Sequence, residues 1–119
     1  MQRIDSDHKD MVRRLAKPPE TIELSDHQKD LLHASIGISS EAGELLDAVK
    51  KHTIYGKELD RENIIEELGD LEFYMAMMRE QVGITRDAVL VLNMHKLGRR
   101  YNNGKYEDSA AIARKDKEV

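Results

Sequence analysis

The 119-residue sequence contains no cysteine and no tryptophan, and it has only one phenylalanine and two prolines. The absence of cysteine removes thiolate metal ligands and leaves the redox environment of the protein open. The shortage of aromatic side chains disfavours a β-sandwich. With 39% hydrophobic and 35% charged residues, the composition favours a folded helical protein over a disordered chain.

Long apolar runs are also absent, since no stretch approaches the roughly 18 residues that a membrane span requires. The first residues lack the apolar segment of a signal peptide, so we expect a cytoplasmic protein with no membrane partner. A net charge of −4 and a pI near 5.7 disfavour a general nucleic-acid surface, which needs a basic face. A local basic patch can still bind a free nucleotide.

Apolar periodicity and capping signals predict an all-α protein with a single domain over residues 1–119. The predicted helices span about residues 7–17, 25–52, 60–82 and 86–101, and they form an antiparallel bundle of about four helices. Gly37, inside the second helix, indicates a kink or a tight contact. Residues 102–119 form a charged C-terminal tail with a short helical stretch near 110–114. A domain of this size gains stability by association with copies of itself.

Two acidic couplets organise the middle of the chain. Glu41 and Glu44 lie three residues apart in the second predicted helix, and Glu67 and Asp70 lie three apart in the third. At this spacing the members of each couplet project from nearly the same side of a helix. A turn around Tyr55 separates the helices, and an antiparallel hairpin brings both couplets to the same level. We therefore expect four carboxylates to converge.

Carboxylates held this close repel one another unless a cation or several hydrogen-bond donors compensate them. Oxygen ligands select a hard cation, and Mg²⁺ fits best if phosphates supply part of its coordination shell. A solvated acidic face is the commoner explanation of a single couplet. Gly43 and Gly69, one inside each couplet, favour the metal site because glycine in a helix costs about 1 kcal/mol relative to alanine. Their presence suggests close backbone approach or room for a ligand.

A basic row lies on the fourth predicted helix, where Asn93, Lys96 and Arg100 occupy positions i, i+3 and i+7. Counted from the break at Gly83, this row passes at the level of the acidic couplets. Lys96 and Arg100 can therefore contact phosphate oxygens that share the metal. The alternative is an ion pair between one of these two cations and a carboxylate, and the two arrangements are compatible.

Three segments together resemble the MazG-type family of all-α nucleoside triphosphate pyrophosphohydrolases: Ser-Glu-Ala-Gly-Glu-Leu at 40–45, Glu-Glu-Leu-Gly-Asp-Leu at 66–71, and Asn-Met-His-Lys-Leu-Gly-Arg-Arg-Tyr at 93–101. The resemblance implies hydrolysis of a nucleoside triphosphate to monophosphate and pyrophosphate by a metal-activated water. It implies Mg²⁺ as the cofactor and a homo-oligomer, either dimer or tetramer. By position, the implied metal ligands are Glu41, Glu44, Glu67 and Asp70, and the implied substrate contacts are Asn93, Lys96, Arg100 and Tyr101.

Ser40 departs from the family pattern, because members of the family often carry an acidic residue there. The number of metal ions therefore stays open, and so does the general base, for which Glu41 and Glu44 are the candidates. A related pyrophosphohydrolase acting on dUTP or phosphoribosyl-ATP is an alternative, as is a non-catalytic acidic helical module that binds a basic partner. A di-iron bundle is disfavoured because the chain contains no Glu-x-x-His pair.

Overall fold

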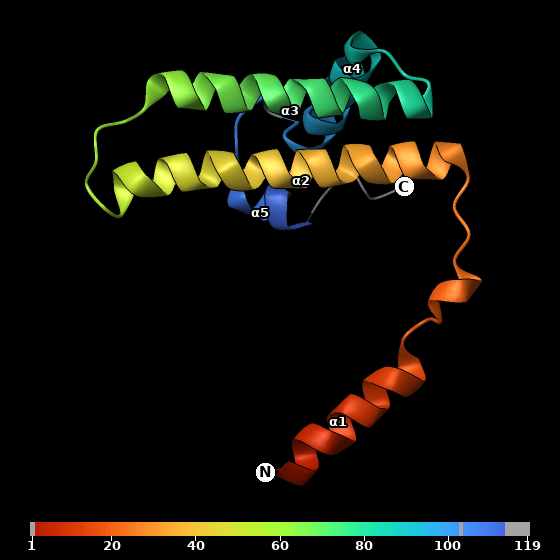
Figure 1. The fold of residues 1–119 in the computed structure, drawn as a ribbon. Coiled ribbons are helices and arrows are strands. Elements are labelled where there is room, and N and C mark those ends of the chain that lie inside the picture. Colours follow the sequence, from red (N-terminus) through yellow and green to blue (C-terminus); the bar gives the residue numbers. More distant parts are fainter. Residues whose placement is uncertain (1, 103, 114–119) are drawn as a thin grey trace.

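The computed structural model describes residues 2–102 and 104–113, and within these ranges all regular elements are helical (Figure 1). The all-α prediction is confirmed. The elements are, in chain order, α1 (Gln2–Leu15), the short 3₁₀-helix η1 (Pro19–Thr21), α2 (Asp26–Thr53), α3 (Arg61–Val82), α4 (Arg86–Arg100) and α5 (Asp108–Ala113).

Helix α1 begins at Gln2, five residues before its predicted start, and it ends at Leu15. The predicted start was wrong because the polar residues ahead of the apolar repeat also favour the helix. Lys9 Nζ lies 3.0 Å from Asp5 Oδ2, one helical turn away, and such pairs support an exposed helix. Pro18 has extended backbone angles and Pro19 opens η1, so the prolines separate α1 from α2.

Helices α2 and α3 form an antiparallel hairpin and lie side by side along most of their length (Figure 1). A capping box starts α2: Ser25 Oγ accepts from the Gln28 amide at 3.1 Å, and Gln28 Oε1 accepts from the Ser25 amide at 2.9 Å. Asp60 Oδ1 starts α3 by accepting from the Asn63 amide at 3.1 Å. These caps fix where each arm of the hairpin begins.

A tight turn joins α3 to α4. Gly83 ends α3 with φ 69°, a left-handed conformation that glycine adopts without a Cβ penalty. Thr85 Oγ1 then accepts from the Ala88 amide at 3.1 Å and starts α4. Arg86 Nη2 lies 3.8 Å from Glu72 Oε1, which links the start of α4 to α3. The turn thus directs α4 back beside the hairpin.

The predicted helical stretch near 110–114 corresponds to α5, in which Ala110 is buried. The end of that stretch and the rest of the tail, residues 114–119, lie outside the described residues, as does Asn103. No helix in the described part of the chain is long and apolar enough to cross a membrane. The cellular location of the protein stays a prediction.

The single chain buries little apolar surface. Among the described residues the buried hydrophobic side chains are those of Ala34, Ala48 and Ala110. The accessible surface of 10059 Å² compares with about 6,600 Å² for a compact monomer of this mass. The radius of gyration of 20.7 Å likewise exceeds the roughly 13.5 Å of a compact domain. One chain alone does not close a helical bundle, and its completion by further copies stays a prediction.

Candidate metal centre

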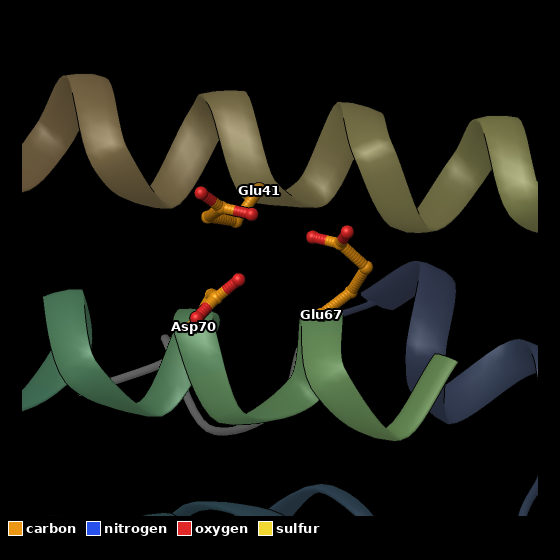
Figure 2. A group of neighbouring side chains, drawn as sticks. All are labelled: Glu41, Glu67 and Asp70. Atoms are coloured by element: carbon orange, nitrogen blue, oxygen red, sulfur yellow. The ribbon is translucent and has the colours of Figure 1, made fainter. Parts of the chain in front are cut away.

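Three of the four predicted carboxylates meet between the arms of the hairpin. Glu41 projects from α2, Glu67 and Asp70 project from α3, and each contributes an oxygen that lies within 4.8 Å of the other two (Figure 2). Glu41 and Glu67 are half-buried, whereas Asp70 is exposed. The antiparallel pairing predicted from the couplet spacing therefore produces a compact acidic group. We call Glu41, Glu67 and Asp70 the acidic triad.

Glu67 has the most perturbed environment in the triad. A hydrogen bond with Glu41, desolvation, and the charges of Glu41, Asp70 and Glu44 raise the pKa of Glu67 from 4.5 to about 7. Its Oε2 atom is shielded from solvent and has no hydrogen-bond partner among the described residues. A shielded acceptor without a donor is costly, and a cation is one way to satisfy it.

The donor set fits a hard divalent cation. All three side chains offer carboxylate oxygens, which Mg²⁺ and Ca²⁺ prefer over nitrogen or sulfur ligands. The exposure of Asp70 leaves one side of the triad open to solvent and to further ligands. Mg²⁺ commonly keeps such open positions for water and substrate phosphates.

Glu44 lies outside the triad and is exposed. It remains close enough for its charge to contribute to the raised pKa of Glu67. The structure thus groups three of the predicted ligands and leaves the fourth beside them. The role of Glu44 as a ligand stays a prediction.

Gly37 and Tyr74 bring the two helices together one turn away from the triad. A Cβ atom added to Gly37 would overlap the ring of Tyr74, so only glycine accommodates the ring there. Gly37 precedes Glu41 by four residues, and Tyr74 follows Asp70 by four. The contact therefore sets the helix separation at the triad. The predicted tight contact at Gly37 is confirmed.

The sequence analysis did not identify Tyr74 as the partner of Gly37. His33 and Phe73 extend the contact, with ring centroids 5.9 and 5.1 Å from that of Tyr74. Gly43 and Gly69 differ from Gly37, because no described atom outside the neighbouring residues and backbone of the same helix lies within 4 Å of a Cβ built on either. Neither glycine marks a close backbone approach in the single chain, and room for a ligand stays a prediction.

The predicted substrate row lies on α4 and at its end. Asn93 is exposed, whereas Lys96, Arg100 and Tyr101 are half-buried. In the described part of the chain no ion pair joins Lys96 to a carboxylate. The ring of Tyr101 lies 5.5 Å from that of Tyr106, between centroids. Contact between this row and a substrate stays a prediction.

A cavity of about 350 Å³ lies near the turn of the hairpin, where α2 ends and α3 begins. Its lining starts at Ala48, one turn after Glu44, and includes Lys51 and Tyr55. Lys51 pairs with Asp47 at 3.1 Å, and Lys50 Nζ lies 5.6 Å from the ring centroid of Tyr55. Lys50 and Lys51 therefore have intrachain partners, and the cavity lining also contains the acidic side chains of Glu58 and Asp60.

Comparison with known proteins agrees with this geometry. The chain is 29% identical over 89 residues to the Gene 37 protein of Mycobacterium phage L5, which corresponds to 71% of this chain and 77% of the phage protein. No solved structure matches the chain at a significant level. Residues 31–104, which contain the whole hairpin core and α4, match the model of the MazG nucleotide pyrophosphohydrolase domain. Because that match spans more than half of the chain, the protein belongs to the MazG nucleotide pyrophosphohydrolase family.

Proposed function

We propose that this protein is a Mg²⁺-dependent nucleoside triphosphate pyrophosphohydrolase that converts a ribo- or deoxyribonucleoside triphosphate to its monophosphate and pyrophosphate. The observation that carries the proposal is the convergence of Glu41, Glu67 and Asp70, with the unpaired Glu67 Oε2, in a chain of this family. Three carboxylates in such proximity repel one another, and a bound cation is one way to compensate their charge.

In this proposal the acidic triad holds Mg²⁺ by carboxylate oxygens. When bound, Mg²⁺ neutralises polyphosphate charge, orients the phosphates and lowers the pKa of an attacking water. The water oxygen bonds to the α phosphorus, the bond to the α–β bridging oxygen breaks, and pyrophosphate leaves. Glu44 is suited to accept the water proton, because it lies next to the triad without being part of it. Glu41 is the alternative base.

The remaining polar side chains then bind the nucleotide. The row formed by Asn93, Lys96, Arg100 and Tyr101 provides cationic and hydrogen-bonding groups for phosphate oxygens. The cavity near Lys51 and Tyr55 is open beside α2 and supports placing the nucleoside end of the substrate towards the hairpin turn. Neither feature selects a particular base or sugar.

Association of copies completes the proposed enzyme. The surface of one chain exceeds that of a compact monomer by about 3,500 Å², and large apolar side chains are exposed on α2, α3 and α4. A standard interface covers about 800 Å² on each partner, so the excess is large enough for extensive contacts in a dimer or tetramer.

The test is pyrophosphate release from a panel of ribo- and deoxyribonucleoside triphosphates, with and without Mg²⁺. We expect equal amounts of monophosphate and pyrophosphate, dependent on the metal and lost in Glu67→Gln. Glu66→Gln is the matched control, because Glu66 is adjacent but exposed and outside the triad. Loss of activity in both variants, or in neither, would contradict the assignment of the triad.

The same panel separates the alternatives. Release from dUTP alone, or from phosphoribosyl-ATP alone, would identify a more specific pyrophosphohydrolase with the same metal site. No release from any of these substrates would favour an acidic helical module that binds a basic partner.

A further inference from the structure

Helix α1 is amphipathic, and its apolar side chains are exposed among the residues that the structure describes. Ile4, Met11, Val12 and Leu15 form one stripe along it, at positions i, i+7, i+8 and i+11. All four are exposed, with Ile4 at 73% and Leu15 at 75%. Figure 1 shows α1 projecting away from the hairpin at the end of a linker. Its apolar stripe therefore faces solvent in the single chain.

A matching apolar groove lies where α2, α3 and α4 meet. It has a volume of about 280 Å³ and is lined by Ile38, Met75, Met78, Val82, Ile84 and Val89, together with the side chain of Arg79. No described residue fills this groove. Methionine-rich surfaces of this kind adapt to the shape of an apolar partner. The groove and the stripe of α1 are thus two exposed apolar surfaces of the same chain.

The linker directs α1 away from the groove of its own chain. Residues 16–25 contain Pro18, with φ −59° and ψ 130°, and the 3₁₀-turn that begins at Pro19. Proline restricts both its own backbone and that of the preceding residue, so this linker is stiffer than an ordinary loop of its length. In the arrangement shown in Figure 1, the apolar stripe of α1 is therefore accessible to a second copy of the chain.

We propose that α1 is exchanged between copies: its apolar stripe docks in the α2–α3–α4 groove of a second copy of this chain. The inference rests on the proposed association of copies and goes beyond it by naming the two surfaces that meet. Helix α1 is about 21 Å long, so its stripe extends beyond the groove and contacts neighbouring apolar side chains. The exchange hides part of the excess apolar surface on both copies.

Cysteine cross-linking tests the proposal, because the natural chain contains no cysteine. Met11→Cys places a thiol on the stripe of α1, and Met78→Cys places one in the groove. The two full-length variants carry different affinity tags and are co-expressed, purified through both tags and oxidised. A disulfide requires Cα atoms within about 7 Å, so a bond between the variants reports direct docking. Ser6→Cys, on the opposite face of α1, replaces Met11→Cys in the control.

The expected result is a disulfide-linked heterodimer that contains both tags, lost when Ser6→Cys replaces Met11→Cys. A doubly substituted chain that forms an intrachain bond at high dilution, without linked heterodimers from the single variants, would overturn the exchange and show docking in the same chain. Light scattering on the wild type separates this failure from failure of association. An oligomer without the cross-link overturns only the exchange, whereas a monomer overturns both proposals.

Discussion

The α2–α3 hairpin and α1 differ in how their helices pack within a single chain. Both are built from helices with clear sequence signals, but the two arms of the hairpin pack against each other, whereas the apolar stripe of α1 is exposed in the single chain. The hairpin carries the acidic triad, and its arms are held together near that triad by Gly37 and Tyr74. The acidic triad is thus built within one chain, whereas the apolar stripe of α1 is the surface that we propose a second copy covers.

The largest expected effect comes from a substitution that forces the two arms of the hairpin apart. Gly37→Val places a branched side chain where the Tyr74 ring lies, and we expect the free energy of unfolding to fall by about 3 kcal/mol, the upper end of typical overpacking costs. Gly37 is one turn from Glu41, so the same variant should also bind Mg²⁺ more weakly. Chemical denaturation and Mg²⁺ titration measure the two effects.

Gly43→Val is the matched control, in the same helix but with no described atom within 4 Å of the new Cβ. Glycine and valine have similar helix propensities, so this change should alter stability by less than about 0.5 kcal/mol. Equal losses in the two variants would contradict the Gly37–Tyr74 contact as the determinant of helix separation.

The second prediction concerns the negative charge of the acidic triad. Mg²⁺ at 100 times its dissociation constant should stabilise the wild type by about 2.7 kcal/mol through binding to the folded state. Asp70→Asn removes one triad charge, so we expect the metal-free variant to melt higher than wild type and to gain no stability from Mg²⁺. Thermal melts at increasing Mg²⁺ concentration measure both effects, and a normal response in this variant would remove Asp70 from the metal site.

The raised pKa of Glu67 gives a smaller, pH-dependent effect. Its pKa is about 7 in the folded chain and returns to about 4.5 on unfolding, so between these values the folded state binds more protons. The contribution of Glu67 to stability is therefore complete below about pH 4.5 and is lost as pH rises to about 7. Without metal, the wild type should lose stability relative to Glu67→Gln between pH 5 and pH 8.

The measurement is the difference in unfolding free energy between the two proteins at each pH, which cancels the titration of other groups. Mg²⁺ should raise the stability of the wild type at pH 8 and leave Glu67→Gln nearly unchanged. A difference that stays constant from pH 5 to pH 8 would contradict the raised pKa.

The difference between the two regions also separates what sequence reasoning could and could not predict. The caps at Ser25, Asp60 and Thr85 and the couplet spacing are local signals, so the helices and the meeting of Glu41 with Glu67 and Asp70 were predictable. The partner of Gly37 was not, because packing of Tyr74 across the hairpin depends on helix rotation that spacing alone does not fix. Helix rotation also decides whether Glu44 joins the other three carboxylates. The couplet spacing did not show that Glu44 would lie beside the acidic triad rather than in it.

The smallest predicted effect lies at the junction between the two regions. Ser25→Ala removes the cap of α2 and should cost about 1 kcal/mol of stability, whereas Ser39→Ala, an exposed change inside α2, should cost nothing. Ser25 lies 16 residues before Glu41, about 24 Å along the helix, so the stabilisation by Mg²⁺ should be the same in both variants. Denaturation with and without Mg²⁺ measures this. Loss of the Mg²⁺ response in Ser25→Ala alone would mean that the linker which positions α1 also holds the acidic triad in place, and the hairpin could then no longer be treated as independent of α1.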